Sequence, residues 1–299
     1  MKFAAIDIGS NAIRLLIKES IFKSNHEFYF QKISFTRVPL RLGYDVFNSG
    51  YIKEPTIEKL INAFNAFELL MQINEVDFYR ACATSAMRDA KNGELICEML
   101  LKKTNTKLEI ISGQEEAKLI FSNFHLATID KGADYILIDV GGGSTELSLI
   151  KRGKKIASKS FKLGSVRQLS GTDVESVKLQ MKNWIESHIP NNNMITAMGT
   201  GGSINKIYNL SQNKPQAPLS FDELSDTLNL IKSYNYEQRI RILKLKPDRA
   251  DVIIPSGEIY KLVMESTKAE KIIVPKVGFS DGIIYNLFFF TIIIPIIFF

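Results

Sequence analysis

The chain alternates between two hydrophobic patterns, and each pattern predicts a different kind of element. Short apolar runs such as Tyr135–Val140, rich in β-branched residues, are typical of strands buried on both faces. In longer segments such as 57–71, apolar residues recur every three or four positions, which is typical of a helix with one buried side. Because strands and helices alternate along the whole chain, the pattern predicts an α/β fold.

The same patterns place the individual elements and a domain boundary. We expect strands at 3–8, 12–18, 28–38, 76–83, 107–111, 135–140, 146–150, 159–163 and 271–274. We expect helices at 55–71, 92–102, 112–121, 173–188, 204–210, 221–233, 236–243, 253–265 and from 283 onward. The stretch after residue 38 that contains Gly43 and Gly50 is predicted as a loop. Two domains are expected, 1–119 and 120–299, with the boundary in the helix that carries Glu116.

Candidate chemistry is concentrated in the hairpin YILIDVGGGSTE, Tyr135–Glu146. Asp139 interrupts the apolar run near its end, where a carboxylate is costly unless it is paired or holds a metal. Three glycines then allow a tight turn whose backbone N–H groups are accessible to a phosphate. Glu146 lies on the strand that leaves the turn. Taken alone, the stretch also fits a glycine turn with a solvated Asp. Its candidate phosphate-binding groups are Gly141, Gly142, Gly143 and Ser144.

Two other stretches repeat the pattern of a strand followed by glycine. Phe3–Asn11, FAAIDIGSN, has Asp7 before a glycine, a serine and an asparagine. Residues 194–203, MITAMGTGGS, form a strand-like run that ends in glycines and opens a helix, an arrangement favourable for anions. This internal repeat suggests two similar halves that face each other across a phosphate-binding cleft.

The segment SGQEEAKLIF, 112–121, contains two adjacent glutamates with different expected roles. Ser112 and Glu115 match a helix capping box, which gives Glu115 a structural role. Glu116 lies about 100° further round the helix, in the first turn, where the helix dipole stabilises an anion. Arg88, after a strand that ends in small hydroxyl residues, is a candidate phosphate clamp. For Glu116 and Arg88 alike, an ordinary solvated surface residue is the alternative.

Composition narrows the function less than the motifs do. The 299 residues carry a net charge of +6, which fits a polyanionic ligand but gives no nucleic-acid patch. The two cysteines lack metal-like spacing and fit a reducing cytoplasm. The N-terminus runs straight into a strand, so no signal peptide is expected. P-loop, GxSxG, HExxH and kinase motifs are absent. The chemistry is therefore expected to use carboxylates, hydroxyls and backbone amides, a set that suits Mg²⁺ and phosphate.

Six motifs occur in this order along the chain: FAAIDIGSN, TSAMR, SGQEEAKLIF, LIDVGGGSTEL, LGSV and AMGTGGSI. Through these motifs the chain resembles the exopolyphosphatase / guanosine pentaphosphate phosphohydrolase family of the actin-like ATPase superfamily. The resemblance extends from Phe3 to about Leu287. It implies two ribonuclease-H-like domains with mixed five-stranded sheets flanked by helices, closing on an active-site cleft. It also implies a cytoplasmic Mg²⁺-dependent hydrolase of terminal phosphoanhydride bonds in polyphosphate or guanosine pentaphosphate, connected with the stringent response.

The resemblance also implies roles for single residues. Glu116 would be the catalytic base, Asp139 and Glu146 would hold Mg²⁺ or the attacking water, and Asp7 would be a further metal or water ligand. The implied phosphate-binding residues are Ser10, Asn11, Arg88, Gly141, Gly142, Gly143, Ser144, Gly201, Gly202 and Ser203.

Other functions remain open on the sequence alone. A small-molecule kinase of the same superfamily, a non-catalytic guanosine tetra- or pentaphosphate binder and an actin-type filament protein share these motifs. A homodimer is a further option for assembly, while nucleic acid and a membrane span are not expected. Longer family members add a helical C-terminal region after the second domain. We do not expect that region here, which makes a short polyphosphate or guanosine pentaphosphate comparatively more plausible. The uncharged tail Leu287–Phe299 fits no family pattern and is too short to span a membrane.

Overall fold

A computed structural model describes residues 1–23, 27–127, 129–171, 173–189 and 195–294, which form two compact units. Unit 1 comprises Met1–Ser122 and the C-terminal segment that begins at Phe279, and unit 2 comprises Asn123–Gly278. Among the described residues, no helix combines the length and apolar character needed to cross a membrane.

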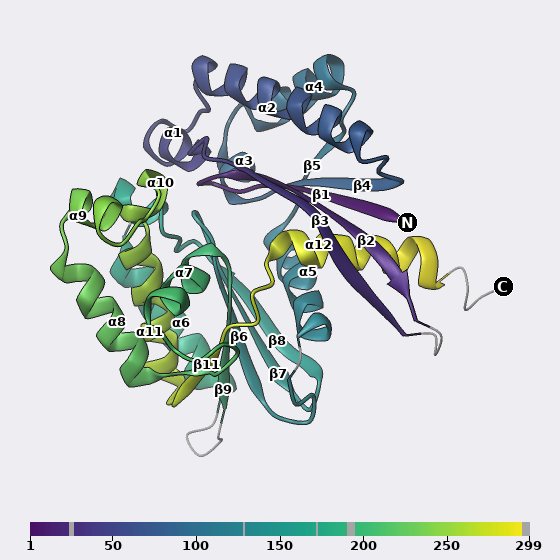
Figure 1. Cartoon of the computed structure of the whole chain (residues 1–299). Helices are drawn as coiled ribbons and strands as arrows, with labels where there is room; N and C mark the ends of the chain where they lie inside the picture. Colours follow the sequence, from purple (N-terminus) through teal and green to yellow (C-terminus); the bar gives the residue numbers. More distant parts are fainter. Residues whose placement is uncertain (24–26, 128, 172, 190–194, 295–299) are drawn as a thin grey trace. The chain divides into compact units, whose positions relative to one another are not determined.

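Unit 1 is built on a mixed five-stranded sheet with the order β3-β2-β1-β4-β5 (Figure 1). Its strands are β1 (Lys2–Ile8), β2 (Ile13–Phe22), β3 (Phe28–Val38), β4 (Phe78–Ala83) and β5 (Leu108–Ile110). Its helices are α1 (Leu42–Ser49), α2 (Glu54–Ile73), α3 (Ser85–Asp89), α4 (Gly93–Thr104), α5 (Gly113–Leu126, continuing into unit 2) and α12 (Phe279–Phe288), followed by a π-helical turn (Phe289–Ile293).

Helices cover both faces of this sheet, which explains why its central strands are apolar throughout. On one face, Ile6 and Leu15 share a core with Phe64 and Phe67 of α2 and with α4. On the other face, α12 packs against β1, β2 and β4 and buries Phe288 completely. The chain therefore returns to unit 1 at its end.

Unit 2 is built on a six-stranded sheet with the order β10-β11-β9-β6-β7-β8. Its strands are β6 (Tyr135–Val140), β7 (Thr145–Lys151), β8 (Lys154–Phe161), β9 (Thr196–Thr200), β10 (Leu219–Ser220) and β11 (Lys271–Ile273). Its helices are a 3₁₀ turn (Arg167–Ser170), α6 (Val174–His188), α7 (Gly202–Leu210), α8 (Phe221–Ser233), α9 (Tyr236–Arg241), α10 (Pro247–Ala250) and α11 (Ile253–Thr267). Side chains of α6, α7, α8 and α11 share one apolar core with the sheet.

The two sheets have the same topology, which confirms the internal repeat. Read in reverse, β8-β7-β6-β9-β11 matches β3-β2-β1-β4-β5 in order. The first three strands of each set pair antiparallel, and the remaining pairs are parallel. Asp7 on β1 and Asp139 on β6 consequently occupy equivalent positions.

The structure confirms the α/β class and two mixed sheets, and it corrects several details. The second sheet has six strands because the short β10 pairs with β11. The stretch with Gly43 forms helix α1, since the lack of a Cβ at Gly43 lets α1 lie against Ser10, whose Cβ would otherwise be 2.8 Å away. The strand expected at 159–163 is β8, which runs earlier because it pairs with all of β7. The helix expected from 283 begins at Phe279.

The expected division at 119/120 lies close to the boundary between Ser122 and Asn123, but the C-terminal assignment differs. The segment from Phe279 was expected in the second domain. It belongs to unit 1 because α12 supplies the apolar cover of the β1–β2–β4 face. Met194 and residues 295–299 of the tail lie outside the described residues.

Candidate active site

Asp139 and Glu146 lie directly opposite each other on neighbouring strands of unit 2. The antiparallel register of β6 and β7 pairs the two residues, and their exposed fractions are 7% and 2%. The Ser160 hydroxyl on β8 donates to Glu146 Oε1 at 2.8 Å. Like charges at directly opposite positions repel each other, and a cation relieves this repulsion. The pair therefore offers the donors that Mg²⁺ prefers, which are one or two carboxylates supplemented by phosphate oxygens.

A larger metal cluster is not needed for this ion. Among the described residues, no group of three or more His, Cys, Asp and Glu side chains is arranged to hold a metal. Mg²⁺ usually keeps several waters and takes its remaining ligands from substrate phosphates. Two carboxylates beside a candidate anion-binding loop are therefore compatible with Mg²⁺ coordination that is completed by waters and phosphate oxygens.

The loop between β6 and β7 fixes the direction of its peptide groups. The Val166 N–H donates to Gly142 O at 2.8 Å, and Arg167 Nε donates to Gly143 O at 2.7 Å. Within the described part of the chain, no protein group accepts a hydrogen bond from the N–H groups of Gly142 and Gly143. Successive N–H groups without a protein acceptor, held in a glycine turn, are the arrangement found in anion-binding backbone nests.

Gly164 makes this packing possible. A Cβ on Gly164 would lie 2.4 Å from Gly143 N and 2.5 Å from the Gly142 carbonyl carbon, so the segment approaches the loop as closely as only glycine permits. The turn itself closes through a hydrogen bond from Gly141 N to Ser144 O at 2.9 Å. The LGSV motif thus packs directly against the backbone of the glycine loop and stabilises its conformation.

The second glycine turn of unit 2 lies against Asp139. Gly201 connects β9 to α7 with a φ of 107°, a conformation that favours glycine. A Cβ at this position would lie 2.9 Å from Asp139 Oδ1. Gly202 and Ser203 form the first turn of α7, where the helix dipole and N–H groups favour an anion.

Tyr260 connects the ends of the two strands that carry these turns. Its hydroxyl accepts a hydrogen bond from Val140 N at 3.3 Å and donates one to Thr200 O at 2.5 Å. Burial raises the pKa of this tyrosine well above its ordinary value, and the charges of Asp139 and Glu146 raise it further. The hydroxyl is therefore a neutral donor.

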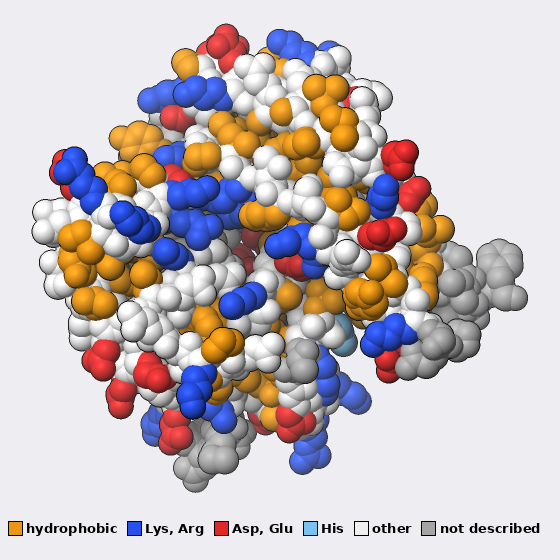
Figure 2. All heavy atoms as spheres, viewed as in Figure 1, with side chains coloured by type: hydrophobic (Ala, Val, Ile, Leu, Met, Phe, Trp, Pro, Cys, Tyr) orange, Lys and Arg blue, Asp and Glu red, His pale blue; other side chains and the backbone are white. Residues whose placement is uncertain are grey.

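A basic region adjoins the N-terminus of α7. Arg249 on α10 donates to Gly202 O at 3.1 Å. Arg239 and Arg241 lie in the last turn of the neighbouring helix α9, and Lys and Arg side chains gather over α9 and α10 (Figure 2). Positive charge beside a glycine turn and a helix N-terminus suits a phosphate.

In the first hairpin of unit 1, the residue opposite the buried aspartate is an arginine and not a second carboxylate. Asp7 is buried, with 3% exposed, and the register of β1 and β2 places Arg14 opposite it. Arg14 Nη1 lies 2.5 Å from Asp7 Oδ2. Where unit 2 has a second carboxylate, unit 1 has a guanidinium that compensates the charge. Asp7 is therefore less suited to a metal than Asp139.

The turn after β1 is held by hydrogen bonds to two helices. The Ser10 and Ser85 hydroxyl oxygens are 2.9 Å apart, and both side chains are buried. Ser10 O accepts from Gly43 N at 2.7 Å, while Asn11 O accepts from Arg41 N at 2.9 Å. The structure thus brings Ser10 and Asn11 together with the start of α3, which also carries Arg88.

Arg88 and Glu116 form an ion pair. Arg88 Nη1 donates to Ile111 O at 2.7 Å and to Glu116 Oε2 at 3.2 Å. The Glu116 side chain is largely buried, with 9% exposed, and that of Arg88 is 26% exposed. An adjacent guanidinium favours the ionised form of a carboxylate. The two predicted residues therefore belong to one site.

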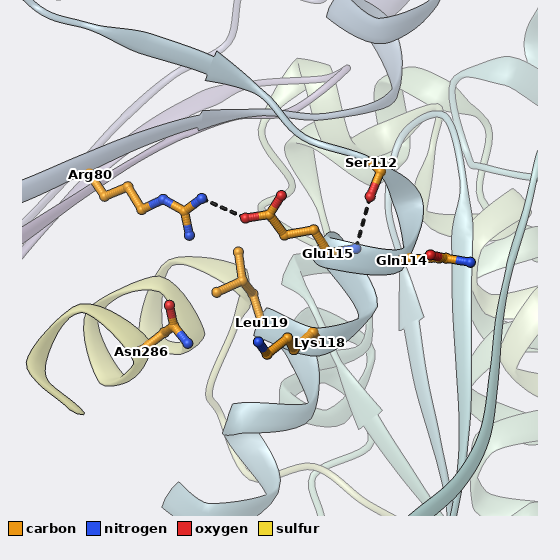
Figure 3. A pocket seen from close by; sticks show the side chains of 7 residues that line it. All are labelled: Arg80, Ser112, Gln114, Glu115, Lys118, Leu119 and Asn286. Atoms are coloured by element: carbon orange, nitrogen blue, oxygen red, sulfur yellow. Dashed lines mark hydrogen bonds and ion pairs between the residues drawn. The ribbon is translucent and has the colours of Figure 1, made fainter. Parts of the chain in front are cut away.

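Glu115 points to a different part of unit 1. Ser112 Oγ accepts from Glu115 N at 3.1 Å, as expected for a helix cap. The Glu115 carboxylate binds Arg80 at 2.5 Å, and Arg80 also binds Glu109 at 2.8 Å. Figure 3 shows this pair beside a pocket of about 330 Å³ that Lys118 and Asn286 also line.

The structure groups the predicted residues by unit. Unit 1 contains Asp7, Ser10 and Asn11 in its first hairpin and the contacting pair Arg88 and Glu116. Unit 2 contains Asp139, Glu146, Gly141, Gly142, Gly143, Ser144, Gly201, Gly202 and Ser203. That Glu116 and Asp7 act with the unit 2 groups across a cleft stays a prediction.

Sequence reasoning missed Arg14, Ser160, Arg249 and Tyr260. Arg14 and Ser160 become visible only through strand register. The sequence does not indicate a role for Tyr260, because a tyrosine in an apolar helix is interpreted as a core residue. Arg249 had a weak signal, since it lies in the polar turn PDRAD.

Comparison with known proteins identifies relatives over the full chain. The model of the Ppx/GppA phosphatase family matches residues 20–288. A bifunctional 3-dehydroquinate synthase/phosphatase of Fusobacterium nucleatum is 29% identical over 91% of the chain, which spans 44% of that longer protein. Exopolyphosphatase 2 of Mycobacterium tuberculosis is 26% identical over 96% of the chain and 98% of its own length.

A solved structure has the same fold. The crystal structure of an exopolyphosphatase from Cytophaga hutchinsonii superimposes with a TM-score of 0.82 at 19% identity, covering 96% of this chain and 97% of that one. At this identity the likeness concerns the fold.

Proposed function

Because this chain belongs to the Ppx/GppA phosphatase family, we propose that it is a Mg²⁺-dependent hydrolase of terminal phosphoanhydride bonds in inorganic polyphosphate or guanosine pentaphosphate. The observation that carries the proposal is the cross-strand pair of Asp139 and Glu146 beside the amides of Gly142 and Gly143, which have no protein acceptor among the described residues. A divalent ion and a phosphate group complement this arrangement better than any neutral ligand.

The two glycine turns of unit 2 supply the groups that hold the anionic chain end. Amides at Gly142 and Gly143 and the N-terminus of α7 at Gly202 and Ser203 offer donors to phosphate oxygens. Arg249 adds positive charge next to the second turn. All these groups bind phosphate through charge and backbone geometry, so they fit any terminal phosphate, whatever the rest of the substrate.

Asp139 and Glu146 would hold the metal, which when bound would neutralise charge on the phosphate oxygens. In the reaction, a water oxygen attacks the terminal phosphorus and the bond to the bridging oxygen breaks. The shortened chain leaves with that oxygen, and orthophosphate is released. Glu116 is assigned as the base that accepts the proton of the attacking water. The ion pair with Arg88 holds the largely buried Glu116 carboxylate in place.

The proposal is tested by release of orthophosphate from the purified protein. The substrates are short and long polyphosphates and guanosine pentaphosphate, each with Mg²⁺ and with EDTA. We expect Mg²⁺-dependent release from at least one of them. ATP turnover that requires a small acceptor, with no release from either substrate class, would instead indicate a kinase. Tight binding of guanosine pentaphosphate without release would indicate a sensor.

Cytoplasmic location is part of the same proposal. Cys82 and Cys97 are both free thiols, and burial raises the pKa of Cys82 to about 12 and that of Cys97 to about 11. Two protonated thiols are compatible with a reducing compartment.

A further inference from the structure

We propose that Tyr260 is a positioning residue that holds the two glycine turns of unit 2 in register around Asp139. The inference rests on the proposed function, and it concerns how the metal-binding carboxylate is oriented.

The hydroxyl of Tyr260 lies at the point where both turns begin. Val140, its donor, immediately precedes the glycine loop, and Thr200, its acceptor, immediately precedes Gly201. Asp139 and Thr200 are paired in the parallel register of β6 and β9. One side chain from α11 therefore joins the last residue of each strand.

Asp139 is close enough to depend on this connection. A Cβ on Gly201 would be 2.9 Å from Asp139 Oδ1, 3.5 Å from Val140 O and 3.6 Å from the Tyr260 hydroxyl. The carboxylate, the end of β6 and the tyrosine thus surround one glycine. Without the hydroxyl, the Val140 N–H and Thr200 carbonyl would lose their shared partner inside the protein. A small separation of the two strand ends would then move the carboxylate relative to the amides of the glycine loop.

The chain contains a matched control. Tyr208 on α7 is also buried, with 4% exposed, and its hydroxyl lies within hydrogen-bond distance of two backbone carbonyls, Lys214 O at 2.7 Å and Ala217 O at 2.9 Å, which share its one donor proton. These bonds hold a loop after α7, whereas those of Tyr260 hold the residues next to the glycine turns. Replacing either tyrosine by phenylalanine removes one buried hydroxyl that donates to the backbone, so the difference between the variants reports on its position and on the added bond from Val140 N.

The experiment compares Tyr260→Phe and Tyr208→Phe in the full chain. Mg²⁺ binding is measured by calorimetry in the presence of inorganic phosphate, and phosphate release is measured as kcat and KM. Supporting groups around a metal ligand typically contribute 10- to 100-fold to metal affinity or activity. We expect Tyr260→Phe to weaken Mg²⁺ binding and lower kcat by about that factor. Tyr208→Phe should stay within about threefold of the unmodified protein while losing similar thermal stability.

Each outcome decides the inference separately from the proposed function. Equal Mg²⁺ binding and kcat in the two variants overturn it, as does a folded Tyr260→Phe protein with unchanged values. If Tyr260→Phe does not fold, even at 4 °C with a stabilising osmolyte, while Tyr208→Phe folds, the hydroxyl has a general structural role and the inference is also wrong. If the unmodified protein releases no phosphate from any substrate, the proposed function fails, and the Mg²⁺ calorimetry alone then decides on Tyr260.

Discussion

At the residue scale, two adjacent glutamates on α5 have separate environments. Glu116 is largely buried beside Arg88, while Glu115 is more exposed and binds Arg80. The helix turns by about 100° per residue, so neighbouring side chains face different parts of unit 1. This makes Glu115 a natural control for Glu116.

Replacing Glu116 by glutamine should lower kcat by about 10²- to 10⁴-fold, the usual contribution of a general base. Glu115→Gln should change kcat by less than about threefold, because it removes a partly exposed ion pair that contributes little to the active site. Phosphate release and circular dichroism of both variants check this. Equal activity of the two proteins would exclude Glu116 as the base.

Gly164 offers a second test at this scale. A methyl group there would meet Gly143 N at 2.4 Å, so Gly164→Ala must push the 163–167 segment and the glycine loop apart. We expect the free energy of unfolding to fall by about 1–3 kcal/mol, as for overpacking elsewhere. KM for the phosphate substrate should rise, since the amides at Gly142 and Gly143 lose their orientation. Denaturant unfolding and steady-state kinetics measure the two effects, and an unchanged KM would contradict the role given to this segment.

At the element scale, α12 contacts the sheet through the Lys18–Asp281 ion pair and a large apolar face. Lys18 on β2 forms an ion pair with Asp281 in the first turn of α12, and both side chains are mostly buried, with 13% and 16% exposed. Removing one partner leaves a poorly solvated charge. The pair therefore ties the helix to the sheet in one register.

A double-mutant cycle measures this contact. Lys18→Met and Asp281→Asn should each lower the free energy of unfolding by about 1–3 kcal/mol, and the double variant by less than the sum of the two. Chemical denaturation of the four proteins gives the coupling. Additive effects would show that the ion pair does not hold α12.

Much of the fold was predictable from local pattern at this scale, because each hairpin combines an apolar strand with a glycine turn. The strands around Asp7 and Asp139 were found for this reason. Helix α1 was missed because a glycine such as Gly43 usually indicates a loop. In the structure, Gly43 instead allows α1 to pack closely on Ser10. The packing of α12 on unit 1 was missed because the sequence of an apolar helix does not specify which sheet the helix covers.

The candidate site was predictable where a residue's type and neighbours in sequence define its chemistry, as for Glu116, Asp139 and Glu146. The site was not predictable for residues whose role depends on which other residue the fold places beside them. Arg14 compensates Asp7 only because strand register places them opposite each other. Tyr260 lies 120 residues after Val140 in sequence, and the hydrogen bond between them arises from the packing of α11.

At the scale of the whole molecule, unit 1 needs the end of the chain. Phe288, Ile283 and Ile284 are completely buried in the cluster that α12 forms with β1, β2 and β4. Phe288→Ala should lower the free energy of unfolding by about 3–5 kcal/mol. Matched replacement of the half-exposed Phe290 should cost less than about 1 kcal/mol. Thermal and chemical unfolding test this, and equal effects would contradict the assignment of α12 to unit 1.

The duplicated topology carries different charges in its two halves. Equivalent hairpins place an arginine opposite Asp7 but a glutamate opposite Asp139. Because only the second of these two hairpins brings two carboxylates together, we assign the metal to unit 2. The structural role of the first hairpin is then to hold Ser10 and Asn11 against α1 and against α3, the helix that carries Arg88.

Calorimetric titration of Mg²⁺ in the presence of inorganic phosphate tests this assignment most directly. The proteins compared are the unmodified chain, Asp139→Asn, Glu146→Gln and, as a control, Glu186→Gln on the exposed side of α6. We expect Asp139→Asn and Glu146→Gln to weaken Mg²⁺ binding at least about tenfold, while the control leaves it unchanged. Equal Mg²⁺ affinity in all four proteins would contradict the assignment.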